Sequence, residues 1–195
     1  MLILARHGRT EANASGLLLG RLDPPLDELG QSQAKAVAAA LVGVLAPGSR
    51  IVSSPLRRAR DTAAAFGLPV AVEDRWVELD YGSFDGRPAG EVGAEVWDRW
   101  RVDADFVPAG GESLTAMAAR VWQACEDLAE EAAHHDVVVV THVSPIKAAM
   151  AWALGAGVET AWRSHVDPAS ITRVSVTPRG PVLRSFNEVW HLQEL

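Results

Sequence analysis

The stretch "DVVVVTH", residues 136–142, predicts the centre of the fold. Four consecutive valines are typical of a strand buried on both faces, because a strand with one solvated face would alternate apolar and polar residues. Such strands occur in parallel sheets that helices cover on both sides. The run ends at Thr141 and His142, so this strand brings an imidazole to the carboxyl edge of the sheet, where such folds bind their ligands.

Outward from this strand, apolar runs alternate with helical periodicity. Strands are predicted at 1–5, 50–54, 69–72, 170–177 and 181–186. Helices are predicted at 26–46 with Asp27 as N-cap, 55–66, 112–133 and 145–154. The alternation predicts an α/β fold, a three-layer α-β-α sandwich with a mostly parallel central sheet. The sequence contains no internal repeat or low-complexity linker, so a single domain over residues 1–195 is expected.

The segment 87–111, "RPAGEVGAEVWDRWRVDADFVPAGG", interrupts this regular pattern. It is rich in glycine, tryptophan and charge, and it is interpreted as a lid-like excursion over the sheet rather than a core element. Two alternative roles are compatible with the sequence for Trp97, Trp100 and Phe106. They form a lid or substrate wall, or they anchor the segment to the body of the protein. The residues alone leave both uses open.

The composition of the 195 residues excludes several classes of protein. A net charge of -7 argues against a broad basic face for nucleic acid, although a small basic pocket is compatible with it. The single cysteine, Cys125, excludes a disulfide framework and a cysteine-rich metal site. The chain shows neither a leader-like start nor an apolar stretch of membrane-spanning length. We therefore expect a cytoplasmic monomer or homodimer without nucleic-acid or membrane partners.

Two histidines and a group of arginines are expected at one edge of the sheet. The first strand leads into Arg6, His7 and Gly8, and the strand at 136–142 ends at His142. The strand at 50–54 continues into "SSPLRRARDTA", which places further arginines at the start of a helix. Because the carboxyl ends of parallel strands meet at one edge, the three groups are predicted to lie close together.

This combination favours a phosphate over a metal ion. Guanidinium groups repel a cation, whereas a phosphate dianion accepts paired N–H donors from arginine and single donors from imidazole. Gly8 lets the backbone approach such an anion closely. Singly, an arginine at a helix start is more often solvated, as is expected for Arg57 and Arg60. Acidic residues form no compact set with ligand spacing, and "AHHD" at 133–136 is interpreted as an exposed helix end, so no metal is expected.

Blocks of the chain, in order, resemble the histidine phosphatase superfamily, which has a phosphoglycerate-mutase-like fold. They are "LARHGRTEAN", "GRLDPPLDELGQSQA", "SSPLRRARDTA", "VELDYGSFDG", "AGGES" and "VVVVTHVSPIKA", followed by "DPASITRVSV". The resemblance covers nearly the whole chain. It implies an enzyme that needs no cofactor and acts on a small phosphorylated substrate.

The resemblance also implies the roles of individual residues. His7 is expected to attack phosphorus and form a phosphohistidine that water later hydrolyses. Glu78 is expected to protonate the leaving alkoxide and then to deprotonate the water. Asp80 and Asp85 lie nearby, and only the family pattern selects Glu78 among these three acids. The sequence does not identify the acceptor that fixes the tautomer of His7.

Further residues are implied as contacts of the substrate. Arg6, Arg58 and His142 are expected to hold the phosphate oxygens, and Asn13 to add a neutral donor. The backbone N–H of Val143 is expected to contact the developing oxyanion. Contacts beyond these are expected from Thr10, Gly20 and Arg21, with a solvated surface arginine as the alternative for Arg21 and for Arg87.

After the second histidine this chain has Val143-Ser144-Pro145-Ile146-Lys147, where most members have two glycines and later an arginine. The run is similar to a branch of acid phosphatase domains linked to α-ribazole phosphate hydrolysis. For Lys147, support of the site and a solvated position both stay open. The substrate is therefore expected to be α-ribazole phosphate or a sugar or glycerate phosphate.

Three functions are compatible with these residues. The first is a metal-independent phosphomonoester hydrolase. The second is a cofactor-dependent phosphoglycerate mutase, which is disfavoured because the chain lacks the insertions that such mutases carry near the site. The third is a phospho-ligand binding protein without catalysis, which is disfavoured because both His7 and Glu78 are present.

Overall fold

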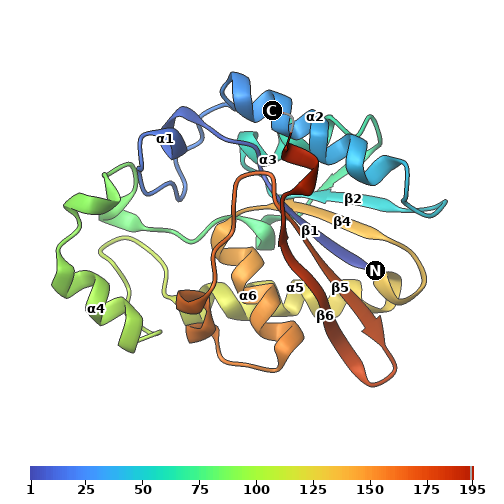
Figure 1. The fold of residues 1–195 in the computed structure, drawn as a ribbon. Helices are drawn as coiled ribbons and strands as arrows, with labels where there is room; N and C mark the ends of the chain where they lie inside the picture. The colour runs from blue at the N-terminus through green and yellow to red at the C-terminus, as the bar shows by residue number, and fades with distance from the viewer. Residues whose placement is uncertain (194) are drawn as a thin grey trace.

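Figure 1 shows the computed structural model of the chain, which describes residues 1–193 and 195. Over that range six strands form one sheet in the order β3-β2-β4-β1-β5-β6. Their bounds are β1 Leu2–Arg6, β2 Arg50–Ser53, β3 Val70–Val72, β4 Val137–Thr141, β5 Ile171–Thr177 and β6 Gly180–Glu188. The first four strands of that order are parallel, β5 is antiparallel to β1, and β6 is antiparallel to β5 and so runs in the direction of the first four. The predicted α/β fold with a mostly parallel sheet is confirmed.

Helices cover both faces of the sheet (Figure 1). One face carries α2 (Glu28–Val42) and α3 (Arg57–Ala64), and the other carries α5 (Leu114–His134) and α6 (Val143–Leu154). Along β1, Leu2 and Leu4 join the core with α5 and α6, whereas Ile3 and Ala5 join the core with α2 and α3. The valines of β4 divide in the same way, so both of its faces need apolar side chains. The predicted three layers are confirmed.

Shorter helical elements complete the chain. The α-helices among them are α1 (Glu11–Ala14) and α4 (Ala94–Val102). The 3-10 turns are η1 (Asp74–Trp76), η2 (Gly82–Phe84), η3 (Ala89–Glu91), η4 (Val158–Arg163) and η5 (Trp190–Leu192). Among the residues that the structure describes, no helix has the length and apolar character needed to cross a membrane.

The register between β1 and β4 positions the functional residues. Arg6 pairs with Thr141, so the two strands end at the same level. The backbone N–H of His7 donates to the carbonyl of Thr141 at 3.0 Å. His7 directly follows β1 and His142 directly follows β4, so the two histidines leave the sheet side by side.

Several predicted helix boundaries are wrong by two or more residues: the helices predicted over 26–46, 55–66, 112–133 and 145–154 span 28–42, 57–64, 114–134 and 143–154. The helix predicted from Pro145 begins at Val143, with His142 as its N-cap. Proline is tolerated at the third helical position because the N–H it lacks would have no partner within the helix. The helix predicted from residue 55 begins at Arg57, because Leu56 still has an extended backbone. Asp27 is confirmed as the N-cap of α2, where its carboxylate accepts from the Gly30 N–H.

For the segment 87–111 the structure supports the anchoring role that the sequence left open beside that of a substrate wall. It contains α4, and Trp100 on that helix is 1% exposed and belongs to the core. The Trp100 ring contacts those of Tyr81, Trp97 and Phe106 at centroid distances of 5.6–5.8 Å. Figure 1 shows α4 apart from the sheet, on the side where α1 lies. Aromatic packing therefore anchors the segment through Trp100.

Candidate active site

His7 and His142 form the centre of the candidate site. Their rings are buried, 3% and 0% exposed, and their centroids are 5.0 Å apart. Both stand at the carboxyl edge of the sheet, as the sequence predicts. Burial and the neighbouring guanidinium groups of Arg6 and Arg58 hold the pKa of each histidine well below its ordinary value. Both imidazoles are therefore neutral near pH 7.

The tautomer of His7 is fixed by the carbonyl of the next residue. Nδ1 lies 2.7 Å from the Gly8 carbonyl oxygen, which can only accept, so Nδ1 carries the proton. Nε2 then keeps its lone pair and accepts from Nε of Arg58 at 3.2 Å. A neutral imidazole whose lone pair lies on a defined nitrogen can act as a nucleophile when the hydrogen bond to that nitrogen is released. The acceptor that the sequence could not identify is thus the Gly8 carbonyl.

Glycine at position 8 is required by packing rather than by an approaching anion. A Cβ atom on Gly8 would lie 2.3 Å from the carbonyl oxygen of Gly30, in the first turn of α2. The Gly8 N–H donates to Oγ1 of Thr62 on α3 at 3.0 Å. The loop after β1 is therefore fixed between α2 and α3, and this fixes the ring of His7.

Two buried arginines supply positive charge without a carboxylate partner. Among the described residues, neither Arg6 nor Arg58 forms an ion pair within 4.0 Å. Arg6 donates through Nη1 to the Val166 carbonyl, and its Nε is buried without a partner in the described part of the chain. Burial lowers the pKa of Arg6 to about 10 and also lowers that of Arg58. Buried, uncompensated cations mark a site for an anion.

Arg58 also organises the loop that precedes α2. Its Nη1 donates to the Leu22 carbonyl at 2.6 Å and its Nη2 to the Gly20 carbonyl at 2.9 Å. Gly20 itself lies against the polypeptide after Glu78, because a Cβ there would be 2.7 Å from the Leu79 carbonyl oxygen. One fully buried guanidinium thus joins the loop at 19–22 to the nucleophile.

His142 is held by a serine that sequence reasoning missed. Its Nε2 lies 2.7 Å from Oγ of Ser54, which follows β2. The Ser54 oxygen accepts from the Leu56 N–H, so its own proton is free to donate to Nε2. The ring proton is then assigned to Nδ1, which is buried without a partner in the described residues. His142 therefore offers an unused donor inside the site.

Glu78 is the acid of the candidate site. Its carboxylate is 3% exposed and accepts from the N–H of Leu79 at 2.7 Å and from that of Ser144 at 3.1 Å. Ser144 lies in the first turn of α6, so the helix that begins after His142 also orients the acid. Glu78 acts electrostatically on both Arg6 and Arg58, which places it beside the same cations.

The two competing acids have structural contacts instead. Asp85 accepts from three successive backbone N–H groups of the loop at 20–22, at 2.8–2.9 Å. Asp80 accepts from the Gly82 N–H at 2.9 Å. Both carboxylates therefore fix turns. Glu78 acts electrostatically on both Arg6 and Arg58, whereas Asp85 acts on Arg58 alone of the two. This distinction could not be made from spacing.

Arg120 on α5 is a further residue that the sequence did not indicate. It donates to the carbonyls of Arg75, Val77 and Glu78 at 2.6–3.2 Å. It also forms a two-point ion pair with Glu112, with both N–O distances 2.8 Å. Arg120 thus supports the backbone that carries the acid. A helical arginine has no sequence signal for this role, because its partners are carbonyl groups some 40 residues away.

The remaining predicted residues surround this centre. Thr10 is the N-cap of α1, and its hydroxyl and N–H both bond to the Asn13 side-chain oxygen. The Asn13 amide –NH2 group remains available as a donor. Arg21 is 39% exposed and lies 3.5 Å from carboxylate oxygens of Asp80 and Glu112, so it is not freely solvated.

The surface arginines behave as expected. Arg57 and Arg60 are exposed at the start of α3, which confirms their predicted solvated positions, and Arg87 is exposed as well. The helix end at 133–135 is also exposed, with α5 ending at His134, and Asp136 is half-buried. Among the described residues, no group of three or more His, Cys, Asp or Glu side chains is arranged to hold a metal ion.

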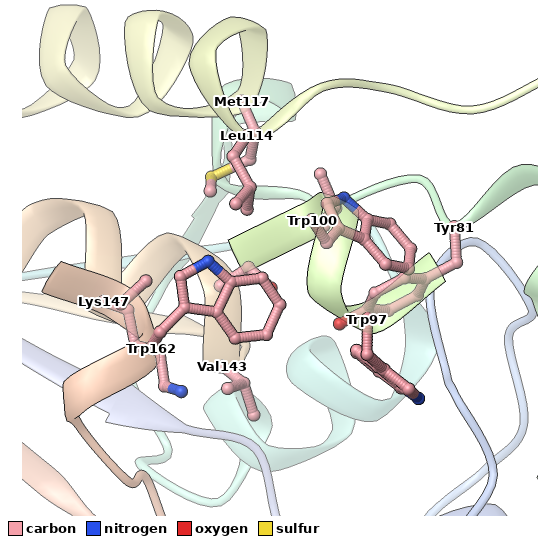
Figure 2. Close-up of a pocket in the computed structure, with 11 residues that line it drawn as sticks. Tyr81, Trp97, Trp100, Leu114, Met117, Val143, Lys147 and Trp162 are labelled. Atoms are coloured by element: carbon pink, nitrogen blue, oxygen red, sulfur yellow. The ribbon is translucent and has the colours of Figure 1, made fainter. Parts of the chain in front are cut away.

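A pocket of about 190 Å³ opens beside Glu78. Leu79 and Ser144, whose N–H groups hold the Glu78 carboxylate, belong to its wall, as do Val143 and Lys147 of α6. Figure 2 shows Trp162 and Lys147 on one side of the pocket and Tyr81, Trp97 and Trp100 on the other. The sequence indicated Trp97 and Trp100 as wall or anchor, and the structure gives both roles. It did not indicate Trp162 or Tyr81.

Comparison with known proteins agrees with this geometry. A sequence model described as the histidine phosphatase superfamily, branch 1, matches residues 2–189. A bifunctional protein of Mycobacterium tuberculosis is 38% identical over 181 residues, 88% of this chain and 49% of the relative, so the chain spans about half the length of that relative. Phosphoserine phosphatase 1 of Hydrogenobacter thermophilus is 35% identical over 99% of this chain and 94% of its own.

A solved structure is similar over its full length. The crystal structure of a phosphoserine phosphatase mutant from Entamoeba histolytica, in complex with phosphoserine, matches with a TM-score of 0.89. The sequences are 28% identical, and the match covers 98% of both chains.

Proposed function

The chain belongs to the histidine phosphatase superfamily, and on that premise we propose that it is a metal-independent phosphomonoesterase acting through a phosphohistidine at His7. One observation carries the proposal. The Nε2 lone pair of His7 lies beside the buried guanidinium of Arg58, which has no carboxylate partner in the described residues. This is a nucleophile next to an anion site. The same cations disfavour binding of a metal ion by charge repulsion.

In the first step the phosphate monoester binds with its non-bridging oxygens toward Arg6, Arg58 and His142. Nε2 of His7 attacks phosphorus, an N–P bond forms, and the P–O bond to the leaving alcohol breaks. Glu78 donates its proton to the departing oxygen, so the alcohol leaves neutral. The Nδ1–H bond to the Gly8 carbonyl stabilises the positive charge that develops on the imidazole.

In the second step water replaces the alcohol. The Glu78 carboxylate takes a proton from the water, whose oxygen attacks phosphorus while the N–P bond breaks. Inorganic phosphate and neutral His7 result. Through both steps the three equatorial oxygens carry the charge, so fixed donors around them lower the barrier. Val143 adds its backbone N–H at the N-terminus of α6, where the helix dipole favours an anion.

The proposed substrate is a small phosphorylated metabolite. α-Ribazole phosphate and sugar or glycerate phosphates are the candidates, supported by the family and by the size of the pocket beside Glu78. We include a cytoplasmic setting in the proposal, because the single cysteine leaves the chain without the disulfides that are common in secreted proteins. Neither nucleic acid nor a membrane is a proposed partner, and the protein is proposed to act as a monomer or homodimer.

The test is hydrolysis of 4-nitrophenyl phosphate in excess EDTA, followed in steady state and in a single turnover. Wild type is expected to turn over and to form a phosphate adduct on His7 that mass spectrometry detects after rapid quench. His7→Ala is expected to abolish both signals, and His134→Ala, at the exposed end of α5, is expected to change neither.

Other outcomes would favour the remaining functions. Phosphoryl exchange between 2- and 3-phosphoglycerate with a bisphosphate primer, without net hydrolysis, would show a mutase. Binding of inorganic phosphate without an adduct or turnover on any ester would show a binding protein. Hydrolysis that survives in His7→Ala would refute the proposed nucleophile.

A further inference from the structure

Lys147 is a half-buried ammonium group without an ion-pair partner. It lies on α6 one turn after Val143 and belongs to the wall of the pocket beside Glu78. No carboxylate of the described residues lies within 4.0 Å of it. Burial lowers its pKa, and Glu78 is the one acid whose charge acts on it in the opposite direction. A charge held in this way is costly unless something compensates it.

The rest of this pocket is mostly apolar. Its wall includes three indole rings, those of Trp97, Trp100 and Trp162, together with Leu114 and Met117 (Figure 2). Lys147 is the one cationic side chain among the lining residues, and no acid lines the pocket. A volume of about 190 Å³ is somewhat larger than the roughly 150 Å³ cavity that holds one benzene ring. The pocket therefore suits a flat ring or an apolar group of similar size.

The position of the pocket identifies which part of a substrate would enter it. The N–H groups that hold the Glu78 carboxylate come from Leu79 and Ser144, and both residues line the pocket. Glu78 must reach the oxygen of the departing alcohol, because it protonates that oxygen. The alcohol therefore begins at Glu78 and extends into the pocket toward Lys147.

We propose that the pocket selects phosphate monoesters whose alcohol combines a flat, apolar body with a carboxylate that pairs with Lys147. This inference rests on the proposed phosphatase function and deepens it. The overall charge of -7 repels a substrate that carries an additional negative charge, so a preference for such a substrate requires a local cation. An ion pair in a water-poor pocket is less screened than one at the surface, which makes the preference measurable.

The test compares two esters of the same shape, 4-carboxyphenyl phosphate and 4-carbamoylphenyl phosphate, together with the corresponding 3-substituted pair. The members of each pair differ by one charge at the same position on the ring. For wild type, one of the two carboxylate esters, the 3- or the 4-substituted one, should be the better substrate. We expect its kcat/KM to be at least about 10-fold higher than that of the amide ester with the same substitution, mainly because its KM is lower. The amide is the more activated ester, so chemical reactivity alone would give the reverse order.

Substitution of the lysine should remove this preference. In Lys147→Met the ratio of the two kcat/KM values is expected to fall to about one or below, and Lys147→Arg is expected to keep most of it. Lys35→Met is the matched control, because Lys35 is the other lysine of the chain and lies exposed on α2. Its ratio is expected to equal that of wild type.

Two results would overturn the inference. The first is a wild-type ratio at or below one for both pairs. The second is a Lys147→Met variant that slows both members of a pair equally, which would show that the lysine acts on Glu78 and not on the alcohol. The variant His7→Ala distinguishes failure of this inference from failure of the proposed phosphatase function. If His7→Ala loses turnover of all four esters, the phosphatase mechanism stands whatever the ratio, and if it keeps turnover, that mechanism fails.

Discussion

The Nε atom of Arg58 lies 3.2 Å from Nε2 of His7, so the lone pair of the nucleophile accepts a hydrogen bond from the cation expected to bind phosphate. Both side chains are buried, which strengthens the contact in the absence of substrate. A phosphate oxygen carries negative charge and is a better acceptor than a neutral imidazole nitrogen. We therefore expect binding of a phosphate ester to draw the arginine N–H away and to release the lone pair for attack.

Replacing this arginine by lysine should impair catalysis severely. Lysine keeps the charge but lacks the planar fork that holds the loop at 19–22 through both Nη atoms while Nε–H donates to His7. For Arg58→Lys we expect kcat/KM on 4-nitrophenyl phosphate to fall by about 10²–10³-fold. Arg60→Lys, an exposed neighbour on the same helix, is the control and should stay within a factor of two. Similar activities for the two variants would show that Arg58 does not contact the phosphate.

Glu78→Gln should separate the two chemical steps. With 4-nitrophenyl phosphate the leaving group needs little protonation, so phosphorylation of His7 continues. The attack of water needs a base and should slow by about 10²–10⁴-fold. Stopped-flow kinetics should therefore show a burst of 4-nitrophenol equal to the enzyme concentration, followed by slow turnover. Loss of the burst together with the turnover would mean that the acid is needed only to form the site.

The buried histidines should make the fold sensitive to acid. Their native pKa values are depressed, so below the unfolded value of about 6.5 the unfolded chain binds more protons than the native one. Stability is then complete above that value and decreases as the pH falls, by up to about 1.4 kcal/mol per pH unit for each histidine. Urea unfolding between pH 8 and 5 measures this slope. The double variant His7→Gln, His142→Asn should flatten it, and an unchanged slope would assign the effect to other groups.

Gly8→Ala should destabilise the protein and reduce its activity. The added Cβ would lie 2.3 Å from the Gly30 carbonyl oxygen, which forces apart the loop after β1 and the first turn of α2. Overpacking of this kind typically lowers the free energy of unfolding by about 1–3 kcal/mol. Gly90→Ala is the control, because a Cβ at Gly90 meets nothing within 4 Å. Equal urea midpoints for the two variants would contradict the packing role of Gly8.

Much of the fold could be predicted from sequence because its signals are local. The valines of β4 and the apolar run of β1 require burial on two faces, and the helices between the strands have clear periodicity. The convergence of His7 and His142 with the arginines at the start of α3 followed from the topology, because parallel strands end at one edge, and the family resemblance selected Arg58 among them. These predictions needed no knowledge of distant contacts.

Other parts of the site depend on contacts that no local pattern encodes. Ser54 and Arg120 act through partners far along the chain, namely the ring of His142 and the carbonyls beside Glu78. The aromatic pocket combines Tyr81 and Trp162, which lie some 80 residues apart. The segment containing Trp100 is rich in glycine and charged residues, and its sequence left open whether its aromatic side chains anchor it or line a substrate wall. Its one buried indole outweighs those exposed residues in deciding where it packs.

Because Arg6 pairs with Thr141, the geometry of the candidate site depends on the correct alignment of β1 with β4. A slip of β1 against β4 by one residue would move one histidine along the sheet by about 3.3 Å and turn the alternating side chains of β1 to the opposite core. A chain that misaligns these strands would thus lose its nucleophile geometry and its buried apolar contacts in the same event. Enzymatic activity after refolding should therefore report the fraction of molecules with native strand alignment.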